Sequence, residues 1–263
     1  MYGALAGDIA GSVYELNNVK TKNFGLYSAP GLHFTDDSVM TIAVAKSLWD
    51  TMENDYFGLT DALIKNMHEI GRRYPFCGYG SDFYNWIIFN GTKPYYSYGN
   101  GSAMRVSECG WVAKTLDEAL DLADITASVT HNHPEGIKGA KAISACIFLA
   151  RNGASKEDIF EYVNRYYYDM NFMLDDIRKY YRFETSCQKS VPQAIKAFIE
   201  SFNFDDALKN AISIGGDSDT IASMTGSIAE AYYGITDRVR LFVDCHLDGY
   251  LLEIVKRRVK DEQ

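Results

Sequence analysis

Cysteine pairs and long apolar runs are missing from this sequence, and each absence narrows the class of protein. The cysteines Cys77, Cys109, Cys146, Cys187 and Cys245 are widely spaced, without a CxxC pair. This spacing argues against a disulfide framework or a cysteine-based zinc site, and it favours reduced thiols in a cytosolic protein. No charged segment precedes an apolar signal-like stretch, and no apolar run is long enough to span a bilayer. We therefore expect a cytoplasmic protein that does not bind membranes.

Positive charge is also in short supply. The chain carries 26 lysines and arginines against 35 acidic residues, a formal net charge of -9. This balance argues against a general nucleic-acid-binding surface. The basic residues Lys256, Arg257, Arg258 and Lys260 cluster close to the last position. We interpret them as a solvated final helical turn, favoured by the helix dipole, in preference to a docking patch.

Convincing alternating strands are absent, and only five prolines interrupt the chain. Apolar residues recur mainly at helical spacing, and Ser155 followed by Asp158 is typical of a capped helix start. The short stretch Ala211–Ile214 is compatible with an extended piece or with a helix end. A length of 263 residues, 47% of them hydrophobic, suffices for one large core. We predict a single all-α domain over residues 1–263, with helices within Ser38–Asp50, Thr115–His131, Gly136–Gly153, Ser155–Tyr167, Asp219–Gly234, Asp237–Leu247 and Gly249–Lys260.

Two helix starts carry more acid than capping requires. "FTDDSVMTIA" places Thr35, Asp36 and Asp37 before one predicted helix, and "IGGDSDTIAS" places Asp217 and Asp219 before another. One such residue would serve as an ordinary cap for free backbone amides. Several carboxylates beside hydroxyls, with no histidine or cysteine nearby, also suit hard divalent cations such as Mg²⁺, Mn²⁺ or Ca²⁺. Spacing alone leaves the two interpretations evenly matched.

Two short motifs suggest other chemistry. "DSDT" matches the DxDxT of haloacid-dehalogenase-type phosphatases, in which Asp217 would be the nucleophile. That motif requires a parallel α/β sheet behind it, so we rank it lower. "DDSVM" resembles the DDxxD of prenyl-diphosphate synthases, but Met40 occupies the fifth position and no second copy follows.

Three further features have more than one interpretation. The spacing of His131 and His133, without a third ligand nearby, favours a structural role over a metal site. Asn100-Gly101 by itself indicates a turn. The aromatic tract Tyr162–Phe183 is compatible with a helical surface bearing buried rings, or with a lid or wall that stacks adenine or selects the acceptor.

Taken together, five segments in order resemble the ADP-ribosylglycohydrolase family. They are "GALAGDIAGSVYE", "FTDDSVMTIAVA", "YGNGSAMRV", "THNHPEGIKGA" and "GGDSDTIASMTGSIAEAYYG", and they run from one end of the chain to the other. The resemblance implies a compact orthogonal all-α bundle with a binuclear metal site. It also makes the cation interpretation of the acidic helix starts the preferred one.

The resemblance implies a role for individual residues. We expect Glu15 to transfer protons beside the scissile bond, with Asp36 as a second catalytic residue. Tyr95, Tyr96 and Tyr98 are candidates for the wall of the adenosine site, and His131 would lie near the ribose and diphosphate. Substrate binding is expected from Tyr98, Gly99, Asn100, Gly101, Ser102 and His131, and two Mg²⁺ ions, for which Mn²⁺ could substitute, from Thr35, Asp36, Asp37, Asp217, Asp219 and Thr220.

The implied activity is a Mg²⁺-dependent hydrolysis that removes ADP-ribose from a modified protein side chain, with arginine favoured over serine. The bond at C1 of the distal ribose would break through an oxocarbenium-like transition state. Two alternatives remain: a catalytically silent protein that binds ADP-ribose, and the phosphatase. We expect a monomer.

Overall fold

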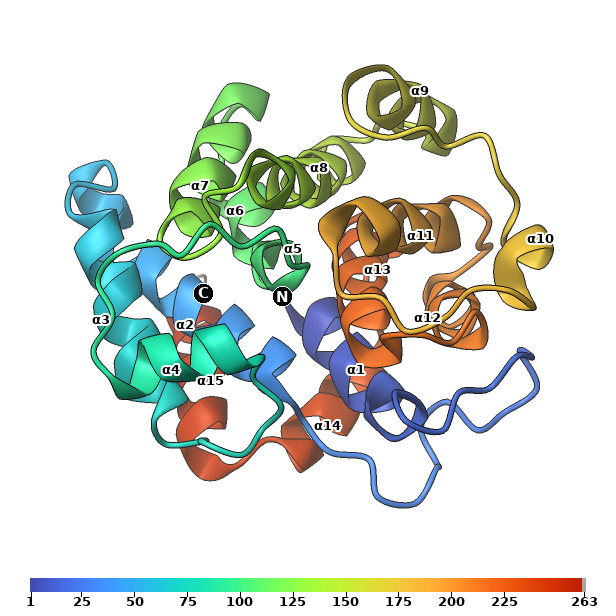
Figure 1. Ribbon diagram of the computed structural model, residues 1–263, viewed down its shortest axis with the longest axis horizontal. Helices are drawn as coiled ribbons and strands as arrows, with labels where there is room; N and C mark the ends of the chain where they lie inside the picture. The colour runs from blue at the N-terminus through green and yellow to red at the C-terminus, as the bar shows by residue number, and fades with distance from the viewer. Residues whose placement is uncertain (262–263) are drawn as a thin grey trace.

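The computed structural model describes residues 1–261, and these form 15 α-helices and two 3₁₀ helices without a sheet (Figure 1). The all-α prediction is confirmed. The helices are α1 (Tyr2–Gly11), α2 (Asp36–Thr51), α3 (Leu59–Gly71), α4 (Ser81–Ile88), α5 (Gly101–Met104), α6 (Ser107–Val112), α7 (Leu116–Ser128), α8 (Pro134–Arg151), α9 (Lys156–Tyr166), α10 (Leu174–Arg178), α11 (Cys187–Ile199), α12 (Phe204–Ser213), α13 (Ser218–Tyr233), α14 (Asp237–His246) and α15 (Gly249–Asp261), with 3₁₀ turns at Ser12–Tyr14 and Met52–Asn54.

The sequence signals for helix ends hold in several places. Ser155 and Asp158 form the reciprocal capping box of α9, and Pro134 opens α8. The stretch Ala211–Ile214 ends α12 and is not extended. In α15, Lys256 pairs with Asp244 of α14 at 3.2 Å. The side chains of Arg258 and Lys260 lie outside the described part of the chain.

Glycines let α1 pack directly on α13 at the centre of the molecule (Figure 1). Gly3, Gly7 and Gly11 recur every four residues, so they share one face of α1. A β-carbon on Gly7 would overlap the carbonyl of Ala222, and one on Gly3 would overlap the carbonyl of Gly226. The two backbones therefore approach more closely than side chains would permit. This contact carries Asp8 of α1 to the beginning of α13.

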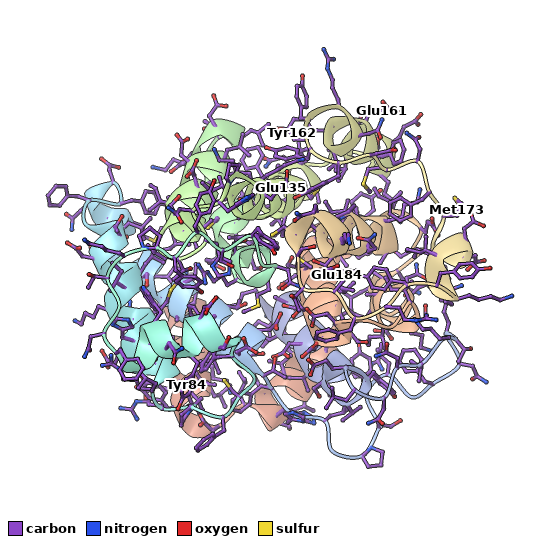
Figure 2. All side chains as sticks on the ribbon, in the orientation of Figure 1. Tyr84, Glu135, Glu161, Tyr162, Met173 and Glu184 are labelled. Carbon is purple, nitrogen blue, oxygen red and sulfur yellow. The ribbon has the colours of Figure 1, made fainter. Side chains whose placement is uncertain are left out.

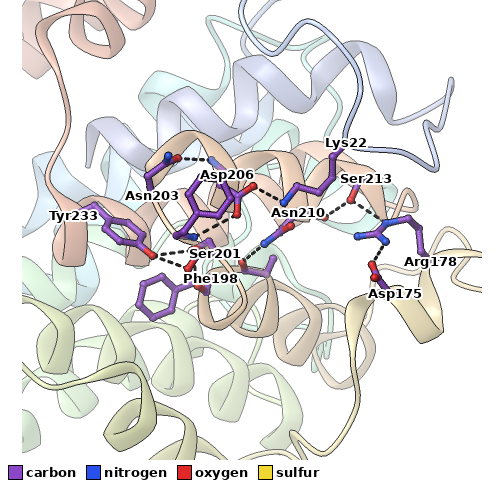
Figure 3. Close-up of polar contacts among 12 residues, drawn as sticks. Lys22, Asp175, Arg178, Phe198, Ser201, Asn203, Asp206, Asn210, Ser213 and Tyr233 are labelled. Atoms are coloured by element: carbon purple, nitrogen blue, oxygen red, sulfur yellow. Dashed lines mark hydrogen bonds and ion pairs between the residues drawn. The ribbon is translucent and has the colours of Figure 1, made fainter.

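A polar network anchors α12, the helix that leads into the acidic turn before α13 (Figure 3). Lys22, from the long connection between α1 and α2, pairs with Asp206 near the start of α12. At the other end, the Nε of Arg178 in α10 donates to Ser213 Oγ at 3.2 Å. Tyr233, at the end of α13, donates to the carbonyl of Ser201 at 2.9 Å. Both ends of α12 are thus tied to neighbouring elements, which fixes where the chain enters the turn.

Among the described residues, no helix has the length and apolar character needed to cross a bilayer.

Candidate metal and ligand site

The acidic beginnings of α2 and α13 meet beside α1. Thr220 Oγ1 donates to Asp37 Oδ2 at 2.9 Å, although the two residues are 183 positions apart. Carboxylate oxygens of Asp8, Asp37 and Asp219 lie within 4.8 Å of one another, and so do those of Glu15, Asp217 and Asp219. The close packing of α1 on α13 and the folding of α2 against α1 produce this concentration of acid.

Asp8 is a site residue that the sequence analysis missed. Its carboxylate is buried and accepts four hydrogen bonds, which come from the amides and hydroxyls of Thr35 and Ser38. Asp8 therefore fixes the turn that begins α2. The available signal was an acid within "GALAGDIAG", where every other residue is small or apolar and no charge is needed for helix formation.

Capping alone does not account for the acids. The hydroxyl of Thr35 caps α2 by accepting from the amide of Asp37 at 3.3 Å. At α13, the N-cap residue is Asp217, whose side chain makes no capping hydrogen bond. The oxygens Asp37 Oδ1 and Asp219 Oδ1 are buried without a hydrogen-bond partner. Buried polar atoms are almost always satisfied, so these two oxygens require a further group, and a cation fits them.

The electrostatics of the cluster also favour a bound cation. Burial raises the pKa of Asp37 and Asp219 well above the ordinary value, and neighbouring carboxylates raise it further. Asp36 is raised well above its usual pKa by the same two causes, with Asp8 and Asp217 as its main charged neighbours. Divalent cations would relieve this repulsion and keep the acids ionised. The donor set of carboxylate and hydroxyl oxygens is the type that Mg²⁺ and Mn²⁺ prefer.

Glu15 follows the 3₁₀ turn that continues α1, and its side chain faces the same cluster. Burial raises the pKa of Glu15, and the charges of Asp217 and Asp8 add to the effect. The backbone at this point is fixed by Asn18, whose amide donates to the Glu15 carbonyl at 2.7 Å and to the Gly216 carbonyl at 3.2 Å. Glu15 is therefore held beside the acidic turn, where its carboxyl group binds a proton more readily than that of an exposed glutamate.

A cavity of about 870 Å³ opens above these acids. Tyr98 and Ser102 do not line it. Tyr98 is half exposed and packs edge-on against His133, whereas Ser102 is buried and donates to the Gly136 carbonyl at 2.7 Å. Of the three tyrosines suggested for the adenosine wall, Tyr95 alone lines this cavity. The predicted site residues that do line it are Glu15, Thr35, Asp36, Asp37, Gly99, Asn100, Gly101, His131, Asp217, Asp219 and Thr220.

The loop Gly99–Gly101 connects the cavity wall to the acidic turn. Asn100 donates its side-chain amide to Asp217 Oδ2 at 2.7 Å, and its backbone amide to the carbonyl of Thr185 at 2.7 Å. A β-carbon on Gly101 would lie 3.2 Å from His131 Nε2. The absence of a side chain at Gly101 leaves room between the loop and the imidazole.

The aromatic tract Tyr162–Phe183 divides into parts with different surroundings. Figure 2 shows Tyr162 on α9 and Met173 at the beginning of α10, both toward the edge of the molecule. Tyr181 lies against Gly216, which has φ +81°, and a β-carbon there would overlap the tyrosine ring. Within this fully described tract, Phe183 is the residue that lines the cavity. The tract is therefore neither a continuous helical surface nor a lid along its whole length.

A second wall of the cavity was not identified from the sequence. The segment 73–83 lines one side, and Phe76 within it is 95% exposed. The Cys77 carbonyl accepts from the amide of Asp36 at 2.9 Å, which ties this segment to the beginning of α2. Its sequence, "RYPFCGYGSDF", is rich in glycine and aromatic residues and indicates a turn, but nothing in it specifies contact with Asp36.

The fold and the site define a helical protein in which a buried cluster of carboxylates lies at the base of a ligand-sized cavity. Sequence comparison gives the family. A family model described as ADP-ribosylglycohydrolase matches residues 1–241, and the chain belongs to that family.

Individual relatives agree with this assignment. The chain is 29% identical to ADP-ribosylhydrolase ARH3 of Mus musculus over 311 aligned residues, which cover 89% of this chain and 82% of that protein. It is 25% identical to ADP-ribosylarginine hydrolase Tri1 of Pseudomonas putida, over 77% of this chain and 59% of that protein. A solved structure described as an ADP-ribosylglycohydrolase-related protein complex superposes with a TM-score of 0.68 at 18% identity, covering 96% of both chains. That structural likeness supports the fold alone.

The phosphatase interpretation of "DSDT" loses its structural basis. It needs a parallel sheet whose strand ends at Asp217, and residues 1–261 form no sheet. The helix α12 precedes this turn instead.

Proposed function

We propose that the protein is a divalent-cation-dependent hydrolase that cleaves the bond between C1 of the distal ribose of ADP-ribose and an acceptor side chain. Family membership supports the ADP-ribose linkage as the substrate class. The structural observation that carries the proposal is the pair of buried, unpartnered oxygens Asp37 Oδ1 and Asp219 Oδ1, at the base of a cavity that Glu15 also lines. A protein that only binds a nucleotide does not need such a costly cluster of acids.

The residues that would hold the cations are Thr35, Asp36, Asp37, Asp217, Asp219 and Thr220, and we propose two Mg²⁺ ions. When bound, the ions would orient the ribose hydroxyls and balance the charge of the carboxylates. We assign Asp8 a supporting role, because its oxygens already accept hydrogen bonds from Thr35 and Ser38. It holds the Thr35 turn in the position that places the other oxygens together.

The protein side chains supply the proton transfer. Glu15 has a raised pKa, which favours its carboxyl group as the one that donates a proton to the leaving group or accepts one from water. Asp36 faces the same cavity and is the second candidate. Cleavage at C1 develops positive charge on the ribose, and the surrounding carboxylates would stabilise it.

We propose arginine as the first acceptor to test, ahead of serine. The name of the relative Tri1 specifies ADP-ribosylarginine. The experiment is incubation of the protein with proteins or peptides ADP-ribosylated on arginine, serine or a carboxylate, and with ADP-ribosylated nucleic acid, in Mg²⁺ and in excess chelator. Free ADP-ribose is measured.

We expect release from the arginine-linked substrate in Mg²⁺ and none in chelator. Release from another substrate would change the acceptor but keep the reaction. Binding of ADP-ribose without release from any substrate would favour the silent binding protein, and full activity in chelator would overturn the proposed dependence on a cation.

A further inference from the structure

Arg105 is a buried cation in the wall of the ligand cavity. Its side chain is 1% exposed, and its Nη2 donates to the Thr126 carbonyl at 3.0 Å and to Thr130 Oγ1 at 2.8 Å. Burial lowers the pKa of Arg105 to about 10, so the guanidinium stays charged at neutral pH. No ion pair joins Arg105 to any acidic residue that the structure describes. A buried charge without a carboxylate is costly, which suggests that the charge acts on something else.

The hydroxyl of Thr130 lies between Arg105 and the imidazole of His131 and contacts both. An arginine can only donate, so Thr130 Oγ1 is the acceptor in this hydrogen bond. The single hydroxyl proton of Thr130 then remains available for another partner. His131 Nδ1 lies 2.7 Å from the same oxygen. The hydroxyl can therefore donate to Nδ1 while it accepts from Arg105.

This arrangement favours one protonation state of His131. A proton on Nδ1 would point at the Thr130 oxygen that already accepts from Arg105, and the hydroxyl proton would have to turn from His131 to Tyr95. An imidazolium would place two cations around one hydroxyl oxygen. Burial and the charge of Arg105 both lower the pKa of His131 well below its usual range. The other titratable side chain that faces the imidazole is Tyr95, whose ring centroid lies 5.8 Å away. The remaining state is neutral, with the proton on Nε2.

The Nε2 atom is directed toward the cavity wall. It lies 3.2 Å from the position that a β-carbon on Gly101 would occupy and 3.6 Å from that on Gly99. His131 lines the cavity together with both glycines. A proton on Nε2 is therefore offered to a ligand oxygen that approaches this loop.

We propose that Arg105 and Thr130 are positioning residues that hold His131 as the neutral Nε2–H tautomer, so that it donates a hydrogen bond to an oxygen of the bound ligand. The identity of that ligand as ADP-ribose rests on the proposed function. The tautomer itself is a property of the free protein and is tested separately.

The first test is ¹⁵N NMR of the protein labelled at its five histidines, without ligand. The variant His131→Gln assigns the His131 resonances. We expect a protonated Nε2, an unprotonated Nδ1 and no titration between about pH 5.5 and pH 8. A proton on Nδ1, or titration near the ordinary histidine value, would overturn the proposal without reference to enzyme activity.

Matched variants test the two positioning residues. Thr130→Val removes the hydroxyl but keeps a branched side chain, and should yield a mixture of tautomers, whereas Thr130→Ser keeps the hydroxyl and should retain Nε2–H. Arg105→Met removes the smaller of the two causes that lower the pKa of His131, so that pKa should rise from its value in the wild type while burial still lowers it. If Thr130→Val leaves a single Nε2–H form, the Thr130 hydroxyl does not determine the tautomer of His131, and the proposed role of Thr130 is wrong. The wild-type spectra decide the question if a variant does not fold.

Binding of ADP-ribose provides the second test. Loss of one donor to the ligand costs about tenfold in affinity, so we expect His131→Phe to raise Kd by about that factor. Arg105→Met should weaken binding less as the pH falls, because a protonated imidazole keeps its Nε2–H donor, a dependence that a purely structural role would not produce. Unchanged affinity in His131→Phe would overturn the ligand contact. Absence of ADP-ribose binding by the wild-type protein would instead count against the proposed function, and the tautomer result would still hold.

Discussion

Asp8 illustrates how one buried carboxylate of the acidic cluster can organise a cavity that it does not itself line. It accepts from both amides and both hydroxyls of Thr35 and Ser38, whereas the amides of Asp36 and Asp37 donate to the Cys77 carbonyl and to Thr35 Oγ1. Hydrogen bonds to an ionised acceptor are stronger than those between neutral groups. The residue therefore couples the packing of α1 to the position of Asp36 and Asp37.

Replacing this acid by its amide should be costly. In Asp8→Asn, the NH₂ group cannot accept, and it would face donors of Thr35 or Ser38. We expect the free energy of unfolding to fall by about 2–3 kcal/mol, measured by urea denaturation. Glu253→Gln is the control, because its carboxylate is exposed and, among the described side chains, pairs with exposed Arg257; it should change stability by less than about 0.5 kcal/mol. Equal stability of Asp8→Asn and the wild type would show that the four hydrogen bonds contribute nothing.

The proton-transfer role of Glu15 predicts a specific kinetic effect. Glu15→Gln keeps the size of the side chain but cannot exchange a proton, so kcat should fall by about 10²–10⁴-fold. Binding of ADP-ribose should change by less than about threefold. Glu184→Gln is the control (Glu184 is labelled in Figure 2), since that carboxylate is not part of the cavity lining and pairs with Lys189. Retention of more than half of the wild-type kcat in Glu15→Gln would remove the residue from the mechanism.

At the scale of elements, the contact of α1 with α13 decides whether the site exists. Gly7 has no room for a side chain, because a β-carbon would overlap the backbone of Ala222. Gly7→Val should therefore separate the helices and destabilise the protein by about 2–3 kcal/mol or more. The same change should weaken Mn²⁺ binding, because it displaces Asp8 from the α2 turn.

The control for this packing is Gly249→Ala, at the beginning of α15, where an added β-carbon meets nothing within 4 Å. Thermal and urea unfolding of both variants give the comparison. If Gly7→Val were as stable as Gly249→Ala, close backbone contact would not be what holds α1 to α13.

The helices and the cavity walls differ in how far the sequence predicts them. Helix periodicity and caps predicted α7, α8, α9 and α13 within a few residues, because these signals are local. The family motifs predicted which acidic turns belong together. The wall formed by residues 73–83, and the division of the aromatic tract around Tyr181 and Phe183, depend on contacts with Asp36 and Gly216 that no local pattern encodes. Asp8 was missed because its four donors are 27–30 residues away.

At the scale of the whole molecule, the acidic cluster links stability to pH. The pKa values of Asp8, Asp36, Asp37, Asp217 and Asp219 are all raised in the folded protein, chiefly by burial. A carboxyl group with a raised pKa binds its proton more tightly when folded. Its contribution to stability is therefore present at low pH and is lost as pH rises through the folded pKa.

Comparing chelator with Mg²⁺ should separate the pH dependence of stability that the acidic cluster causes from that of the other titratable groups. In chelator, we expect Tm to rise as pH is lowered from 8 to about 5.5. In millimolar Mg²⁺, Tm at pH 8 should increase and the dependence on pH should flatten, because the cation binds the ionised carboxylates. Scanning calorimetry in both buffers measures the two slopes. Identical slopes would mean that Mg²⁺ does not engage the cluster.

The central claim is that the beginnings of α2 and α13 together form a divalent-cation site, and Mn²⁺ binding tests it most directly. Electron paramagnetic resonance of free Mn²⁺ during a titration gives the number of ions bound by the intact protein and by Asp219→Asn. We predict two Mn²⁺ per chain in the wild type, and loss of at least one of them in Asp219→Asn. No bound Mn²⁺ at millimolar concentration, or binding that Asp219→Asn leaves unchanged, would contradict the claim.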